Sequence, residues 1–175
     1  MRTQRLIIRR FKTEDWAQIY EYLSDGEVVK YEPRSPLTEE ECRQCIAQFM
    51  ASDDFWAVCL KKGRKLIGQI CLSQKEQNHW ELGYIFNRKF QKKGYATEAI
   101  KKLLDDAFRK RKVHQISACC NPQNTASWKL LERIGMRKKA YFKENTYFKS
   151  DRKGNPIWQD TFIYGILEEE WKYVK

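Results

Sequence analysis

The stretch Trp80-Glu-Leu-Gly-Tyr-Ile-Phe86, followed by Gln91-Lys-Lys-Gly-Tyr-Ala-Thr-Glu98, decides the fold of this 175-residue chain. The apolar and aromatic residues of its first part predict a strand, and the apolar spacing of residues 95–111 predicts a long helix. A glycine-containing loop therefore joins a strand to a helix start. The first N–H groups of a helix lack internal partners and the helix dipole is positive there, so the loop is expected to bind an anion.

The residues of this loop suit a phosphate group. Gly94 lets the backbone turn tightly, Ala96 is small enough for a diphosphate to approach, and Lys92 and Lys93 add positive charge. A tight turn with solvated lysines would have the same composition. By itself the loop predicts an anion site and no particular ligand.

The remaining elements follow outward from this loop. On the N-terminal side we expect a strand at residues 6–11, a helix capped by Thr13, a helix that opens at Thr38, and strands at residues 55–60 and 66–72. On the C-terminal side we expect a strand at 113–120, a helix at 124–134 ended by Gly135, and strands at 137–143 and 157–167. The order is β-αα-βββ-α-β-α-ββ. No linker or repeat interrupts it, so we expect residues 1–175 to form one α/β (α+β) domain.

The formal charge of +11 admits a nucleic-acid partner, because clustered Lys and Arg neutralise phosphates. Much of the excess lies in residues 88–93 and 101–112, and a small polyphosphate ligand would explain the first run equally well. No zinc-finger spacing, RNA-binding aromatic strand or leucine heptad accompanies the charge. We therefore expect no nucleic-acid partner unless the acceptor is itself ribosome-associated.

Apolar stretches and cysteines set the expected compartment. The longest apolar stretches fall far short of the roughly 20 residues of a membrane-spanning helix, and no secretory signal is visible, so we expect a cytoplasmic protein without a membrane partner. Cysteines within apolar runs are expected to be reduced and buried: Cys59, Cys71, Cys119 and Cys120. The lone Cys42-Arg-Gln-Cys45 pair predicts no metal site.

Three separated motifs resemble the GNAT superfamily of N-acetyltransferases. Gln91-Lys-Lys-Gly-Tyr-Ala96 is similar to its Q/R-x-x-G-x-G/A motif after the fourth strand. Gly83-Tyr-Ile-Phe-Asn87 and Asn121-Pro-Gln-Asn-Thr-Ala-Ser127 resemble the branch that contains the ribosomal-protein N-acetyltransferases. The resemblance covers nearly the whole chain. It implies a mixed, mostly antiparallel sheet, and direct attack of a primary amine on acetyl-CoA in a ternary complex.

The resemblance also implies where coenzyme A binds. Backbone amides of residues 92–96 would receive its pyrophosphate, and a bulge would splay strand 80–86 from its neighbour so that pantetheine runs between them. Asn124, which could also be a simple helix cap, would bond the pantetheine arm. The implied cofactor-binding residues are Tyr84, Ile85, Phe86, Gln91, Lys92, Lys93, Gly94, Tyr95, Ala96, Thr97, Asn124 and Ser127.

For proton transfer the resemblance gives candidates. Many family members place a general-acid Tyr seven residues after the Asn, but this chain has Leu131 there. The ribosomal-protein branch has a Ser at the position of Ser127, which is our predicted acid, although it could also simply pack against the cofactor. Glu81 is the first candidate for the base and Glu144 the second. A backbone N–H near Phe86 would stabilise the oxyanion.

The same resemblance places an acceptor cleft between residues 31–34 and residues 147–151, with Tyr31, Trp56 and Trp158 in its lining. The acceptor would be a protein N-terminus or a small amine such as a polyamine, and the protein a monomer or a homodimer. Two alternatives stay open. One is a GNAT-fold protein that binds CoA without turnover, and the other is a basic RNA-associated module.

Overall fold

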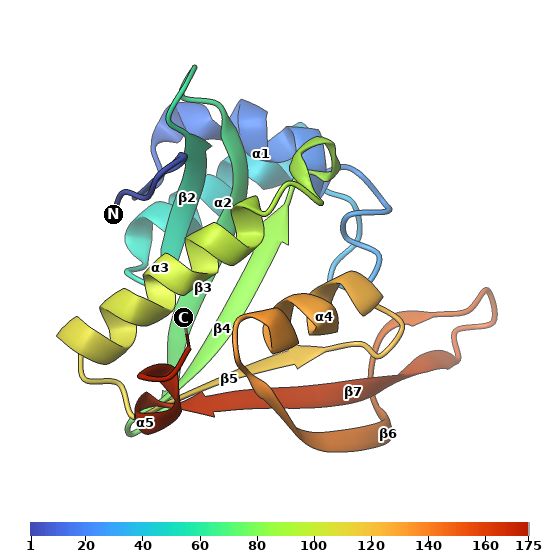
Figure 1. Ribbon diagram of the computed structural model, residues 1–175. Helices are drawn as coiled ribbons and strands as arrows, with labels where there is room; N and C mark the ends of the chain where they lie inside the picture. The colour runs from blue at the N-terminus through green and yellow to red at the C-terminus, as the bar shows by residue number, and fades with distance from the viewer. Residues whose placement is uncertain (175) are drawn as a thin grey trace.

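A seven-stranded sheet forms the centre of the molecule in the computed structural model, which describes residues 1–174 (Figure 1). In chain order its strands are β1 (Leu6–Arg9), β2 (Phe55–Leu60), β3 (Leu66–Glu76), β4 (His79–Phe86), β5 (Gln115–Cys120), β6 (Arg137–Ser150) and β7 (Pro156–Leu167). Their spatial order is β1-β2-β3-β4-β5-β7-β6, and neighbours are antiparallel except β4 with β5. The expected mixed, mostly antiparallel sheet is therefore confirmed.

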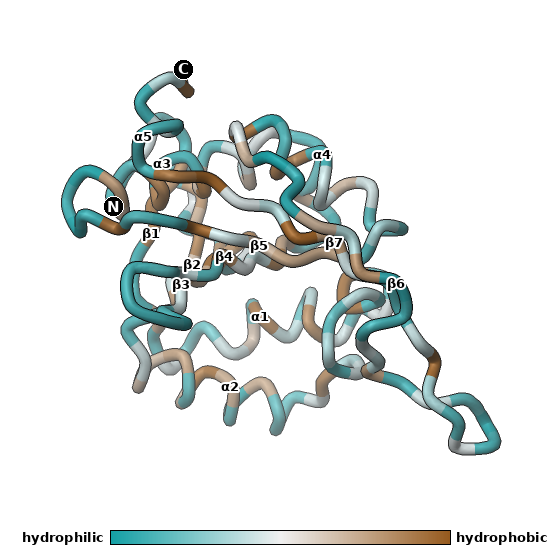
Figure 2. Tube along the Cα trace, turned by 90° about the horizontal axis from the view of Figure 1, so that it is seen from below, coloured by the Kyte–Doolittle hydropathy of each residue, from teal (hydrophilic) through white to brown (hydrophobic). Residues whose placement is uncertain are grey.

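Helices cover both faces of the sheet. They are α1 (Trp16–Leu23), α2 (Glu39–Ala51), α3 (Tyr95–Lys110), α4 (Thr125–Arg133) and α5 (Glu168–Trp171), with short 3-10 turns η1 (Thr13–Asp15) and η2 (Arg88–Phe90). Figure 2 shows α1 and α2 on one face and α3, α4 and α5 on the other. None of the helices within residues 1–174 is long and apolar enough to cross a membrane.

Each face of the sheet has its own hydrophobic core, because side chains of a strand alternate between faces. In β4, Leu82 and Phe86 join the core under α3 and α4, whereas Ile85 joins the core under α1 and α2. Tyr84 packs against the first of these cores. Strand β4, like β2 and β3, thus contributes to the cores under both layers of helices.

The start of α1 differs from the prediction. Thr13 begins the turn η1 and does not cap α1, whose N-terminal flank is the fully buried Asp15. The Asp15 carboxylate accepts two hydrogen bonds from the Arg9 guanidinium, at 2.6 and 2.8 Å, and one from the Lys12 N–H at 2.9 Å. Helix α2, in contrast, begins at Thr38 with the predicted capping box.

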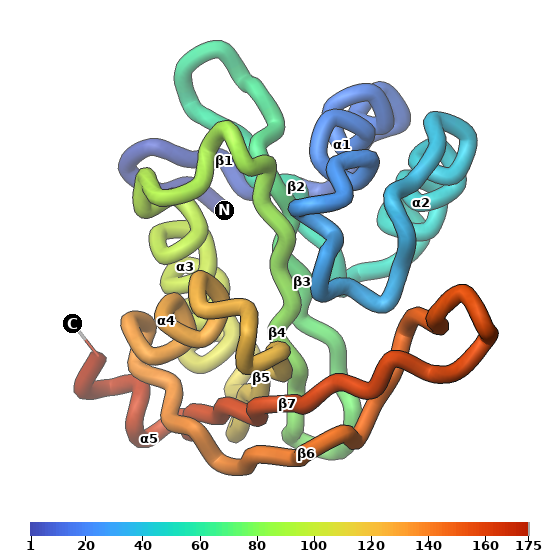
Figure 3. The backbone as a smooth tube through the Cα atoms, turned by 90° about the vertical axis from the view of Figure 1, so that its right-hand side faces the viewer, coloured from blue at the N-terminus to red at the C-terminus, as the bar shows by residue number. Residues whose placement is uncertain are grey.

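Strands β4 and β5 pair only at their beginnings and then part (Figures 1 and 3). Their register ends at Glu81 with Ser117, although β4 continues to Phe86 and β5 to Cys120. The bulge expected in β4 is absent, because its pairing with β3 runs without a shift from Trp80 to Phe86. Strand β4 therefore separates from β5 while it stays paired with β3.

Three further features differ from the sequence expectations. Strand β6 extends to Ser150, and α5 was not predicted. All six cysteines are free, as expected, but Cys119 is exposed, and Cys71 and Cys120 are only half-buried. Cys119 lies on the face of β5 that the α1–α2 layer leaves open, so an apolar run did not mean burial there.

Candidate functional site

The loop before α3 presents free backbone N–H groups. Lys92 and Gly94 have positive φ angles, +58° and +79°, and Gly94 is the N-cap of α3. Glycine has no side chain, so no cap hydrogen bond occupies the first turn of the helix. Residues 91–94 are exposed. The predicted anion-binding helix end is therefore open to a ligand.

The N-terminal segment holds this loop in place through Glu98. The Glu98 carboxylate accepts hydrogen bonds from the Thr3 hydroxyl at 2.5 Å, the Arg5 N–H at 2.9 Å and the Arg5 guanidinium at 2.6 Å. The same guanidinium donates to the Lys93 carbonyl at 3.0 Å and lies over the Tyr95 ring. Burial alone would raise the pKa of Glu98, but these hydrogen bonds lower it below its ordinary value.

Side chains of the loop act partly as braces. Gln91 donates to the Phe86 carbonyl at 3.0 Å and so ties the loop to the end of β4. The Lys93 ammonium donates to the Lys89 carbonyl at 3.1 Å. Lys92 extends from an exposed left-handed position. The side chain of Gln91 is therefore engaged by the protein itself. The backbone N–H groups at the start of α3 are the groups that remain available to a ligand.

The gap between β4 and β5 exposes backbone donors of β4. The Asn87 N–H donates to the Ile67 carbonyl of β3, and amides of an antiparallel strand alternate in direction. The N–H groups of Tyr84 and Phe86 therefore point away from β3, into the gap. Because β5 does not pair with this part of β4, these two donors are free for a ligand.

Tyr84, Ser127 and Cys120 meet on the α4 side of the gap. The Tyr84 hydroxyl lies 2.8 Å from the Ser127 hydroxyl and donates to the Ser127 carbonyl at 3.2 Å. Asn124 caps α4, accepting from the Ser127 N–H at 3.2 Å. Burial raises the pKa of the Tyr84 phenol far above its ordinary value, and that of the Cys120 thiol to about 11, both against hydrogen bonds with Ser127. All three groups thus stay protonated at neutral pH.

A cavity of about 360 Å³ lies at this gap. One wall is the α1–α2 connection, with Tyr31, Glu32 and Pro33, and the opposite wall is the β6–β7 hairpin, with Phe148. Figure 3 shows the hairpin reaching toward that connection. Ser127 lies in the lining between them.

The cavity includes only part of the aromatic lining that the resemblance implied. Trp56 is instead buried in the core under α3, and its expected place in the cleft is wrong because β2 turns it inward. Trp158 stacks edge-on against Tyr147, 5.2 Å between ring centres, outside the lining.

Carboxylates of the cavity have different surroundings. Glu81 lines it and pairs with Lys75 at 3.3 Å. Glu144 does not line the cavity, and its backbone has a positive φ angle of +45°. The Glu144 N–H donates to the carboxylate of Asp160, and Asp160 does line the cavity. Glu81 and Tyr84 lie on opposite faces of β4, as strand alternation predicts without a bulge. Glu32, named from the sequence only as part of a wall, is the third carboxylate in the lining.

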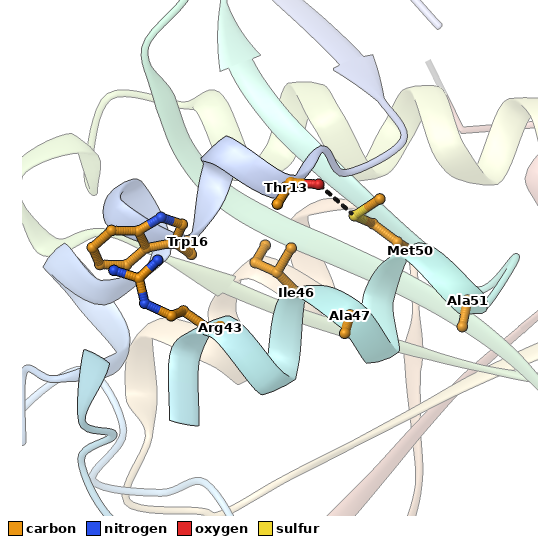
Figure 4. Close-up of a pocket in the computed structure, with 7 residues that line it drawn as sticks. All are labelled: Thr13, Trp16, Arg43, Ile46, Ala47, Met50 and Ala51. Carbon is orange, nitrogen blue, oxygen red and sulfur yellow. Dashed lines mark hydrogen bonds between the residues drawn. The ribbon is translucent and has the colours of Figure 1, made fainter. Parts of the chain in front are cut away.

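A second hollow, of about 550 Å³, lies elsewhere, between η1 and α2 (Figure 4). Its lining is apolar, with Trp16, Ile46 and Met50, and the Arg43 guanidinium stacks on the Trp16 ring at 3.5 Å. Its lining within residues 1–174 includes no carboxylate and no thiol. The cavity beside β4 and β5 is distinguished from this hollow by the free amides and proton-bearing groups in and beside its lining.

Comparison with known proteins points to one family. The model of the acetyltransferase (GNAT) domain matches residues 5–137. The uncharacterized N-acetyltransferase YnaD of Bacillus subtilis (strain 168) is 39% identical over 171 residues, 97% of each chain. The crystal structure of a GNAT-family acetyltransferase from Bacillus anthracis aligns with a TM-score of 0.88 at 38% identity, over 97% of this chain and 98% of that one.

The ribosomal-protein branch is also among the relatives. The [ribosomal protein uS5]-alanine N-acetyltransferase of Escherichia coli (strain K12) is 31% identical over 90 residues. That match covers 51% of this chain and 43% of the enzyme.

Proposed function

The chain belongs to the GNAT family of acetyltransferases and is an acetyl-CoA-dependent N-acetyltransferase, and from this premise we propose how its site works. The proposed acceptor is a primary amine, either a protein N-terminus or a small-molecule amine, which attacks acetyl-CoA directly in a ternary complex. The observation that carries this proposal is the gap between β4 and β5: it joins the open end of α3 to the cavity that holds Ser127.

The residues of the site fit coenzyme A along its length. In the proposed mode, the N–H groups at the start of α3, with Gly94 at the cap, bind the pyrophosphate. The free amides of Tyr84 and Phe86 pair with the pantetheine arm and with the thioester oxygen, where negative charge develops during attack. Asn124, which caps α4, keeps Ser127 next to the sulfur position.

The proposed role of Ser127 is to hydrogen-bond the departing sulfur. A serine hydroxyl is a poor acid, but this one is held by Tyr84, which supplies the phenol that Leu131 cannot. The Tyr84 phenol, with its raised pKa, would serve as a hydrogen-bond donor rather than as the source of the proton. We propose that the proton on the thiolate comes from the amine nitrogen after attack.

Thiol release from acetyl-CoA tests this function. The wild-type protein would be incubated with peptides bearing a free N-terminus, with aliphatic diamines and polyamines, and with amino sugars, and each product identified by mass spectrometry. We expect thiol release above the amine-free background together with an N-acetylated product for at least one class. Tight acetyl-CoA binding without release for any amine would instead support a CoA-binding protein without turnover.

A further inference from the structure

Glu32 is a carboxylate of the cavity that has no hydrogen-bond or ion-pair partner within residues 1–174. Three carboxylates line this cavity and no Lys or Arg of residues 1–174 does, although the chain carries a net charge of +11. Glu81 pairs with Lys75, and Asp160 accepts a hydrogen bond from the Tyr141 hydroxyl at 2.5 Å. Within the described part of the chain, no hydrogen bond or ion pair engages the Glu32 carboxylate.

Two contacts hold the part of the α1–α2 connection that leads into Glu32. Its neighbour Tyr31 donates from its hydroxyl to the Gln123 carbonyl, at 3.4 Å, just before α4. The Lys149 ammonium of the hairpin donates to the Lys30 carbonyl, also at 3.4 Å. The α1–α2 connection is thus attached both to the segment before α4 and to the hairpin, and Glu32 directly follows these two attached residues.

The surroundings of Glu32 favour a cationic ligand. Burial raises its pKa above the ordinary value, opposed by the charge of Arg34, whose guanidinium contacts the Cys45 sulfur at 4.0 Å. The titratable and charged groups that surround it are Arg34, Cys71, Glu81, Tyr84, Cys119, Cys120 and Asp160. A half-buried carboxylate without a partner is unfavourable, and an ammonium group would relieve this cost.

We propose that Glu32 binds the ammonium group of the acceptor and removes the proton that the amine must lose before it attacks. The assignment rests on the proposed function. One N–H bond of the ammonium breaks and its proton moves to Glu32, which later releases it to water. The nitrogen lone pair forms the C–N bond, the C–S bond breaks, and a second proton leaves the nitrogen for the thiolate. The products are the amide and the free thiol.

Glu32→Gln tests this role, with Glu27→Gln as the matched control in the same connection. Glu27 is exposed and does not line the cavity. With an amine that the wild type acetylates, we expect Glu32→Gln to lower kcat/KM by about 100-fold near neutral pH, the scale of a lost general base. Acetyl-CoA binding should be unchanged, which also shows that the variant is folded. The deficit should narrow as the pH approaches the pKa of the amine itself, about 10 for an alkylamine.

Four outcomes would contradict the assignment. Wild-type kcat/KM in Glu32→Gln across the pH range would remove Glu32 from the reaction and leave the proposed function standing. The same would follow from a loss that Glu27→Gln shares, or from one that is equal at every pH. Absence of thiol release by the wild type with every amine would overturn the proposed function and, with it, the role of Glu32.

Discussion

The Ser127 side chain forms hydrogen bonds with two residues that are distant from it in the sequence. Tyr84 reaches it from β4 with a hydroxyl contact of 2.8 Å, and Cys120 reaches it from the end of β5. The position seven residues after Asn124, where the family resemblance implies a tyrosine acid, is Leu131, which is fully buried in the core. Proton-bearing groups therefore gather around Ser127 from the strands and not from its own helix.

Ser127→Ala should lower kcat by about 10-fold to 100-fold, because the sulfur loses a hydrogen-bond donor in the transition state. The Kd for acetyl-CoA should change much less, since the proposed pyrophosphate contacts are at α3. Steady-state kinetics and calorimetric titration would separate the two. Ser117→Ala is the matched control: this serine bonds His79 at 2.8 Å, away from the cavity, and its variant should keep the wild-type kcat.

Tyr84→Phe should lower kcat as well, and the two substitutions should not be additive, because one hydroxyl holds the other. The double variant is expected to be about as slow as Ser127→Ala alone. Wild-type kcat in Ser127→Ala, or fully additive effects of the two changes, would remove the pair from the mechanism.

At the scale of the elements, helices and strands with regular apolar spacing could be predicted from the sequence. Contacts between residues that are far apart in the sequence could not. The amphipathic spacing from Tyr95 onward gave α3, and Thr38 with Glu41 gave the start of α2. The end of β6 was missed because its side chains, such as Tyr147, stay largely exposed and show no inward alternation. The sequence did not identify Glu32 as a candidate base. Whether its carboxylate has an ion-pair or hydrogen-bond partner depends on how the α1–α2 connection folds, and spacing does not show this.

The contact between the N-terminal segment and α3 is another feature that sequence spacing does not show, since Arg5 and Glu98 are 93 residues apart. Glu98→Gln removes the charge that holds this contact. We expect the free energy of unfolding at neutral pH to fall by about 1 kcal/mol, given the partial exposure of Arg5. Acetyl-CoA binding should weaken too, because Arg5 also holds the Lys93 carbonyl.

This contribution should depend on pH. The folded-state pKa of Glu98 is below its ordinary value of about 4.3, so the stabilisation is complete above that pH and is lost as pH falls through the folded-state value. Urea unfolding across this range should show wild type and Glu98→Gln converging in acid. Glu14→Gln, at an exposed pair with Lys12, is the control and should match the wild type. An equal difference at every pH would contradict this account.

At the scale of the whole molecule, the basic charge is less available to nucleic acid than the composition suggests. Side chains of the second basic run pair with carboxylates of α3 itself: Lys102 and Arg109 with Asp105, and Lys110 and Arg111 with Asp106. The first run, around Lys92, stays exposed beside the open end of α3. The net charge of +11 is thus distributed in a way that suits a polyphosphate at one helix end.

Calorimetric titration of acetyl-CoA into the wild type, Gly94→Glu and Gly154→Glu tests the central claim most directly, that the end of α3 holds the cofactor. Both glycines have positive φ angles, +79° and +84°, so both variants carry similar backbone strain and the same added charge, although a Cβ at position 94 also meets the Arg5 guanidinium at 3.3 Å. Gly154 lies in the turn between β6 and β7, where a side chain meets open space. We predict that wild type and Gly154→Glu bind acetyl-CoA alike and that folded Gly94→Glu does not bind it. Wild-type affinity in Gly94→Glu would contradict the claim.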